Sequence, residues 1–169
     1  MHYDTYCKKP LYEVTKELVS TAMGQTPAEM VIKNAKLVNV CTAEIQDDID
    51  VAISEGRIAL VGDASHCIGE STTVIDANGQ YIAPGFIDSH IHVESSMLRC
   101  GEYAKAVIPH GTTTIFMDPH EICNVCGPDA VHFMIDDGLA TPLKIFCNVP
   151  SCVPAVDGFE DTGSRITSA

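Results

Sequence analysis

The spacing of apolar strands in the second half of the sequence is the feature that most limits the possible fold. Strand-like runs occupy Tyr81 to Asp88, Thr112 to Met117 and Lys144 to Val149, separated by helix-like stretches over Ser95 to Ile108 and Pro128 to Leu139. Successive strands therefore begin about 30 residues apart, which is the length of a β-α-β unit. Such units build a parallel sheet whose functional loops follow the carboxyl ends of its strands. The pattern predicts an α/β fold with a site at that end of the sheet.

The first half of the chain has a different pattern. Apolar residues at helical spacing predict an amphipathic helix from Leu11 to Met23, closed by Gly24. After this helix come short β-branched runs divided by turn residues, which predict a small antiparallel β unit. The expected strands are Met30 to Lys33, Leu37 to Val40, Ile49 to Ser54, Ile58 to Gly62 and Thr73 to Asp76. We therefore expect three parts, a helical extension over 1–27, a β unit over 28–80 and the β/α units over 81–169.

Composition restricts the partners of the chain. Apolar residues make up 46% and charged residues 20%, and 10 basic against 23 acidic side chains leave a net charge of −13 with no basic stripe. Nucleic-acid backbones and anionic membranes repel such a chain, so we expect neither as a partner. No apolar run approaches the roughly 20 residues that cross a bilayer, and the start lacks the pattern of a signal peptide. We therefore expect a cytoplasmic protein.

The eight cysteines are scattered through apolar segments. Without a secretory context we expect reduced thiols that contribute to packing, and a disulfide framework is the less favoured interpretation. Cys123 and Cys126 have the spacing of a zinc-binding pair. Because no second pair follows at a zinc-ribbon distance, we do not expect structural zinc.

Potential metal ligands gather where the predicted strands end. His90 and His92 follow the first apolar strand of the second half, two positions apart. Side chains alternate along a strand, so both imidazoles project to one side, where two neutral rings can hold a divalent ion. A catalytic metal site usually takes about three protein ligands and leaves one position open. The metal lowers the pKa of a bound water molecule, so hydrolysis is the expected chemistry.

The spacing of the remaining candidate residues does not decide their roles. His120 and Glu121, at the end of the next strand, are candidates for metal ligation or for contact with the substrate. They could also cap and complement the helix that follows. Glu121 or Glu94 could carry a proton during hydrolysis. Since Ser95 and Ser96 also suit an ordinary helix start, a purely structural role for this segment stays open.

Two parts of the sequence resemble the amidohydrolase superfamily. Pro84 to His92 is similar to the first-strand signature, in which a His-X-His pair ends strand one of a (β/α)8 barrel. The segments Val31 to Ala35, Asp50 to Ile53 and Gly56 to Ile58 resemble part of the small β-sandwich that accompanies this barrel. The implied fold is the first part of a (β/α)8 barrel, preceded by part of a β-sandwich and an N-terminal helix.

Four further blocks narrow the resemblance. His92 to Met97, His110 to Thr114, Asp118 to Ile122 and Pro150 to Ala155 together resemble the adenine deaminases of bacteria. This resemblance implies hydrolysis of adenine to hypoxanthine and ammonia in purine salvage, with a pair of divalent metal ions, manganese first and iron or zinc as alternatives. The resemblance implies that His90 and His92 are metal ligands. His120 and Glu121 match a block of the family that lies near the site. The resemblance also implies a homo-oligomeric complete enzyme.

Length separates the chain from this family. A (β/α)8 barrel takes eight strands and about 250 residues, so three strands cannot close it. We expect the front part of a larger enzyme, and we expect this part to be inactive alone. An unfinished sheet exposes an apolar edge that promotes self-association.

Two alternative functions remain. One is an amidohydrolase that acts on cyclic amides, such as a dihydroorotase or a hydantoinase, and the other is a non-catalytic metal-binding or assembly module.

Overall fold

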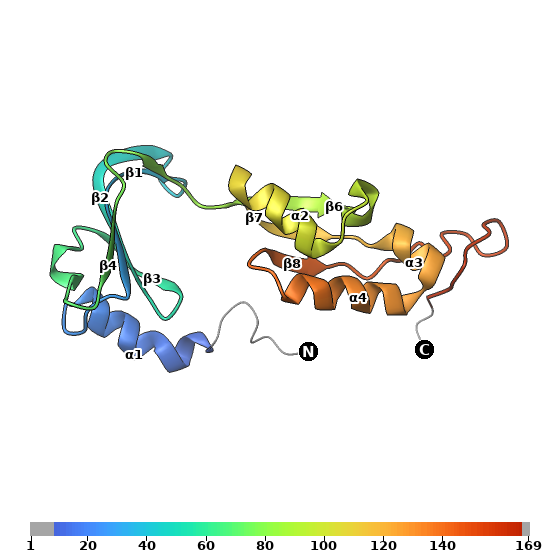
Figure 1. Ribbon diagram of the computed structural model, residues 1–169, viewed down its shortest axis with the longest axis horizontal. Coiled ribbons are helices and arrows are strands. Elements are labelled where there is room, and N and C mark those ends of the chain that lie inside the picture. Colours follow the sequence, from blue (N-terminus) through green and yellow to red (C-terminus); the bar gives the residue numbers. More distant parts are fainter. Residues whose placement is uncertain (1–8, 167–169) are drawn as a thin grey trace. The chain divides into compact units, whose positions relative to one another are not determined.

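The chain forms two compact units, Met1–Pro84 and Gly85–Ala169, in a computed structural model that describes residues 9–166 (Figure 1). Cys7, one of the cysteines expected to be reduced, lies outside the described residues. The seven cysteines in the described part are free thiols. No helix in residues 9–166 combines the length and hydropathy that a bilayer-spanning segment requires.

The first unit contains one helix and a five-stranded sheet. The helix α1 (Leu11–Ala22) confirms the predicted amphipathic helix and contacts β2 and β3. The sheet order is β3-β2-β1-β4, and the short strand β5 also pairs with β1. The strands are β1 (Met30–Asn39), β2 (Glu44–Ser54), β3 (Arg57–Gly62), β4 (Thr73–Asp76) and β5 (Tyr81–Ile82). The core of this unit is built mainly from small side chains, namely Ala28, Val31, Ala52, Ala64 and Cys67.

The expectation of a wholly antiparallel β unit is wrong. β1 pairs with β2, and β2 with β3, in antiparallel fashion, but β4 and β5 both run parallel to β1. Between β3 and β4 the chain crosses from one edge of the sheet to the far side of β1. The 3₁₀ turn η2 (Ser65–Cys67) lies within this connection and buries Cys67 in the core. A strand that runs parallel to its neighbour needs such a crossover connection. The turn residues in the sequence do not show where the chain makes it.

The first strand is continuous, although the sequence predicts two short strands there. The pairing of β1 with β2 shifts register between Ile32 and Ala35. Asn34 lies within this irregularity with φ of 56°, and asparagine tolerates the left-handed region better than most residues. Its backbone N–H donates to the buried carboxylate of Asp50. Asn34 therefore produces a bulge within a strand and does not end it.

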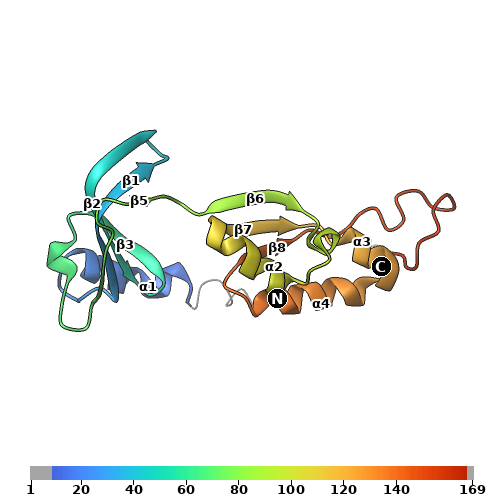
Figure 2. The same cartoon turned by 45° about the horizontal axis from the view of Figure 1, so that its top comes forward.

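The second unit is a three-stranded parallel sheet with helices on one face. Its strands β6 (Phe86–Ile91), β7 (Thr112–Met117) and β8 (Lys144–Cys147) are paired in the order β6-β7-β8. Figure 2 shows the three arrows pointing the same way, with α2 (Cys100–Val107) and α4 (Pro128–Leu139) beside them. Both helices pack on one core whose buried members are Val93, Cys100, Ala104, Ile115, Met117, Met134, Leu143 and Ile145.

Local pattern predicts two of these elements to the residue, β7 and α4. Other expected elements differ. The strand expected over 81–88 is divided into β5 and β6, which belong to different sheets. Gly85 directly precedes β6 and lies close to β7. A Cβ atom at this position would collide with the side chain of Thr113. The expected third strand over 144–149 is shorter and ends at Cys147.

The helix expected over 95–108 is divided into three pieces. It consists of the 3₁₀ turn η3 (Val93–Ser96), the helix α2 and a second 3₁₀ turn, η4 (Ile108–His110). Met97 adopts a left-handed backbone conformation after η3 and separates that turn from α2. A further helix, α3 (His120–Cys126), forms before the predicted helix over 128–139, and its first two residues were expected in the loop that follows the second strand. Both η3 and α3 lie beyond the carboxyl ends of strands, where the candidate site residues gather.

Candidate metal centre

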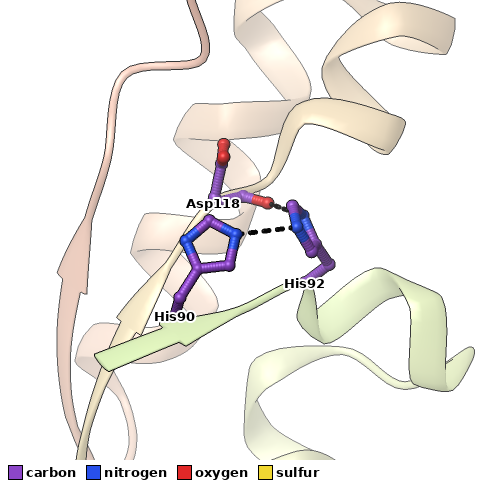
Figure 3. A group of neighbouring side chains, drawn as sticks. All are labelled: His90, His92 and Asp118. Atoms are coloured by element: carbon purple, nitrogen blue, oxygen red, sulfur yellow. Dashed lines mark hydrogen bonds between the residues drawn. The ribbon is translucent and has the colours of Figure 1, made fainter. Parts of the chain in front are cut away.

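The two histidines of the His-X-His pair converge at the end of β6. Ile91 packs against the core on the helix side of the sheet, so alternation directs the neighbouring His90 to the opposite side. The Nε2 atoms of His90 and His92 lie 3.0 Å apart. Figure 3 shows the two rings turned toward each other. Metal–nitrogen bonds are about 2.1 Å long, so two nitrogen ligands at a right angle around one ion lie roughly 3 Å apart. The separation of these two atoms fits joint ligation of one divalent ion.

Asp118 determines which nitrogen of His92 is available. The Nδ1 atom of His92 lies 2.7 Å from the backbone carbonyl oxygen of Asp118, at the end of β7 (Figure 3). A carbonyl oxygen can only accept a hydrogen bond, so Nδ1 carries the proton and donates it. The ring then presents its other nitrogen, Nε2, toward His90. This arrangement is common among metal-binding histidines, in which the second nitrogen donates to an oxygen that orients the ring.

The helix α3 brings His120 and Glu121 beside this pair. Glu121 Oε2 lies 3.1 Å from Nδ1 of His92 and 3.5 Å from Nδ1 of His120. The rings of His92 and His120 meet edge to face, with centroids 4.6 Å apart. The two residues follow β7 closely, and Pro119 between that strand and α3 is fully buried. The first turn of α3 is therefore held against the loop that carries His92.

Glu94 and Ser95 contact the same turn of α3 from η3. Glu94 Oε1 accepts hydrogen bonds from the backbone N–H groups of Glu121 at 3.2 Å and of Ile122 at 3.4 Å. The hydroxyl of Ser95 donates to Oε1 of Glu121 at 2.9 Å. Both contacts join segments that lie more than 25 residues apart in the sequence.

The two carboxyl groups differ in their affinity for a proton. Burial raises the pKa of Glu94 above its ordinary value, and the neighbouring Glu121 carboxyl adds to this rise. Burial also acts to raise the pKa of Glu121, but hydrogen bonds from its own backbone amide and from Ser95 outweigh it, so the net shift is downward. Glu121 is therefore the more readily ionised of the pair.

Unsatisfied polar atoms collect around these side chains. In residues 9–166, six buried side-chain nitrogen or oxygen atoms make no hydrogen bond. Four of them belong to Glu94, Asp118, His120 and Glu121. Buried polar atoms are usually paired, and a group of unpaired ones indicates an absent water molecule or ion. Because three of these residues carry carboxyl groups, the donor set fits a cation.

Two groups of potential ligand atoms within 4.8 Å of one another share His92. One consists of His90, His92 and Asp118, and the other of His92, His120 and Glu121. The five site residues predicted from the sequence lie in one neighbourhood, which Glu94 joins through its hydrogen bonds to α3, although His90 and His120 belong to different groups. Asp118 was not predicted as a ligand. Its position one residue after β7, at the same end of the sheet as the histidines, is the signal that could have identified it.

Comparison with known proteins identifies the family. The Amidohydrolase family matches residues 81–168, slightly more than half of the chain. The chain is 65% identical over 164 residues to an adenine deaminase of Clostridium botulinum (strain Loch Maree / Type A3), covering 97% of this chain and 27% of that protein. It is 57% identical over 157 residues to the adenine deaminase of Moorella thermoacetica, covering 93% and 26%. The chain therefore spans about a quarter of the length of these relatives.

Solved structures support the fold. A prolidase complexed with N-methylphosphonate-L-proline matches 70% of this chain and 31% of its own, with a TM-score of 0.51 and 21% identity. A molinate hydrolase matches 73% of this chain and 30% of its own, with a TM-score of 0.52 and 21% identity. At this identity the likeness concerns the mixed α/β fold alone. The match of the family model over residues 81–168 shows that the chain belongs to the amidohydrolase family.

Proposed function

We propose that the chain is the first quarter of an adenine deaminase, which hydrolyses adenine to hypoxanthine and ammonia in purine salvage. The observation that carries this proposal is the 65% identity to the Clostridium botulinum adenine deaminase over 97% of the chain. In this proposal residues 1–27 are a helical extension, 28–80 are part of a small β-sandwich, and 81–169 are the first β/α units of a (β/α)8 barrel. The parallel order β6-β7-β8 is consistent with such units.

The proposed metal ligands are His90, His92 and His120. Amidohydrolases depend on bound metal, and the convergence of the first two side chains supports their joint role. Asp118 is an additional candidate because its carboxylate belongs to the group with His90. We propose a pair of divalent ions, with Mn²⁺ first and Fe²⁺ or Zn²⁺ as alternatives. Carboxylate oxygens suit Mn²⁺, and imidazole nitrogens suit Fe²⁺ and Zn²⁺.

Glu121 is the proposed proton carrier of this segment. When bound, the metal supplies a Lewis acid that makes water nucleophilic near neutral pH. Glu121 Oε2 faces the rings of His92 and His120 and makes no hydrogen bond, so it is free to accept a proton beside the metal ligands. Its Oε1 is held by Ser95, which fixes the direction of the free oxygen. Glu94, the other carboxylate predicted from the sequence, also has an unpaired Oε2, but its Oε1 accepts hydrogen bonds from two backbone N–H groups of α3.

The proposal includes the setting of the enzyme. Adenine is the proposed small-molecule substrate, and we propose a homo-oligomer of the complete polypeptide with neither nucleic acid nor membrane as partner. We also propose a cytoplasmic location, because the cysteines are scattered through apolar segments of the sequence and do not form the framework typical of a small secreted domain.

The test is to express the full reading frame that contains this sequence and to measure ammonia release from adenine with added Mn²⁺. We expect adenine turnover by the complete polypeptide and none by residues 1–169 alone. The same preparation is assayed with dihydroorotate and hydantoin. Turnover of these cyclic amides without turnover of adenine would show that the substrate is a cyclic amide and not adenine. Turnover by the isolated segment would refute its dependence on the remaining barrel.

A further inference from the structure

The first turn of α3 is capped by a side chain from a distant part of the chain. The first N–H groups of a helix have no partner within the helix. Pro119, at the N-cap position of α3, makes no side-chain capping bond. Glu94, which lies in η3, caps the helix instead. Its Oε1 accepts hydrogen bonds from the backbone N–H groups of Glu121 and Ile122. Bonds of this kind to an ionised carboxylate are stronger than those between neutral groups.

The contact matters because α3 is short. It has seven residues, and isolated helices shorter than about 12 residues are marginal in water. Its orientation therefore depends on contacts outside the helix. Glu94 holds the backbone of Glu121, while Ser95 holds one oxygen of the Glu121 side chain. The other oxygen is then directed to within 3.1 Å of Nδ1 of His92.

We propose that Glu94 is a positioning residue that acts through Glu121, by capping α3 and thereby directing the Glu121 carboxylate toward His92 and His120. Ser95 assists by fixing the second oxygen of Glu121. This inference rests on the proposed function for its catalytic consequence, but the capping contact itself is independent of the substrate. It replaces direct proton transfer as the role of Glu94.

Glu94→Gln and Glu94→Ala separate the two roles in the complete polypeptide. Glutamine keeps an oxygen that accepts the two backbone N–H groups but cannot carry a proton between pH 6 and 9, while alanine removes the cap. We expect Glu94→Gln to retain kcat within about threefold and Glu94→Ala to lose kcat by about 10- to 100-fold with KM little changed. Glu102→Ala, at a partly exposed carboxylate of α2 that pairs with Lys105, is the matched control and should leave kcat unchanged.

Hydrogen exchange measures the cap without any turnover. The amides of Glu121 and Ile122 should exchange faster in Glu94→Ala and at the wild-type rate in Glu94→Gln. Ser95→Ala leaves the cap in place, so it should lower kcat while the two amides keep their protection. Because Ser95 is exposed, this variant also serves if Glu94→Ala does not fold.

Two results would overturn the inference. One is unchanged exchange of both amides in Glu94→Ala. The other is a loss of kcat in Glu94→Gln as large as that in Glu94→Ala while the amides stay protected, which would make Glu94 a proton carrier. Absence of adenine turnover in the wild-type polypeptide would instead refute the proposed function, and the exchange measurement would still decide whether Glu94 positions α3.

Discussion

The Nδ1 atom of His92 lies 2.7 Å from the backbone carbonyl oxygen of Asp118, which joins the ends of two adjacent parallel strands. The acceptor belongs to the main chain, so the bond depends on how β6 and β7 pair and not on the side chain at position 118. It directs Nε2 of His92 toward Nε2 of His90, which lies 3.0 Å away. The readiness of this imidazole pair for a metal is therefore a consequence of strand pairing.

His90→Ala and His92→Ala should each lower metal retention by the complete polypeptide. The two Nε2 atoms converge, so loss of either leaves a site with one fewer ligand and a reduced affinity, by about 10-fold or more. Metal content per chain after dialysis, measured by inductively coupled plasma mass spectrometry, checks this result. His132→Ala, an exposed histidine on α4, is the control and should retain the wild-type content. Equal metal content in all three variants would contradict the proposed ligands.

Asp118→Ala and His120→Ala should distinguish the two ligand groups. The Asp118 carboxylate belongs to the group with His90, whereas His120 belongs to the group with Glu121. Removal of the Asp118 side chain leaves its carbonyl bond to His92 in place, so any loss of metal reports ligation by the carboxylate. If two ions bind, we expect each variant to lose about one equivalent. Loss of metal in His120→Ala alone would restrict the site to the three proposed histidines.

Ile115→Ala should strongly destabilise the second unit. Ile115 is fully buried between the sheet and its helices, and deletion of a buried isoleucine side chain to alanine costs about 2–5 kcal/mol. Urea unfolding followed by circular dichroism gives the change in the free energy of unfolding. Ile87→Ala is the matched control, since this isoleucine on β6 is 64% exposed, and it should cost less than about 1 kcal/mol. Similar losses in both variants would contradict the assigned core.

Cys100 should resist alkylation at neutral pH. Burial raises the pKa of its thiol to about 12, and the negative charges of Asp137 and other neighbours add to this effect. The reactive thiolate is therefore scarce, and the rate of reaction should rise about tenfold per pH unit between 7 and 9. Mass spectrometry after iodoacetamide treatment should show Cys126, which is exposed, modified long before Cys100.

The same shift has a consequence for stability. A folded-state pKa above the unfolded value favours the folded protein while the thiol is protonated, so this contribution is present below about pH 9 and is lost as the pH rises toward 12. Cys100→Ala removes the titrating group, so the variant should lose less stability than the wild type between pH 8 and 10.

The alkylation experiment has its own contradicting result. Equal alkylation of Cys100 and Cys126 at pH 7 would contradict the burial of Cys100.

Local pattern was a good guide where an element is stabilised by its own periodicity. The β-branched and apolar run over Thr112 to Met117 predicted β7, and the helix-like run over Pro128 to Leu139 predicted α4, because each has one face that packs against the other layer. Pattern failed between Ser95 and Ile108, where Met97 interrupts the expected helix. It also missed α3, whose seven residues need a cap from Glu94.

The sequence by itself determined the α/β character of the second half, the succession of strands and helices along the chain, and the presence of imidazole and carboxylate groups after each of the first two strands. These properties follow from residue type and spacing along the chain. Only the tertiary structure decided which atoms meet: the parallel register that brings Ile91 opposite Met117 also places His92 against the carbonyl of Asp118. Contacts between residues 26 or 27 positions apart depend on how layers pack, and packing is a property of the whole fold that no local pattern contains.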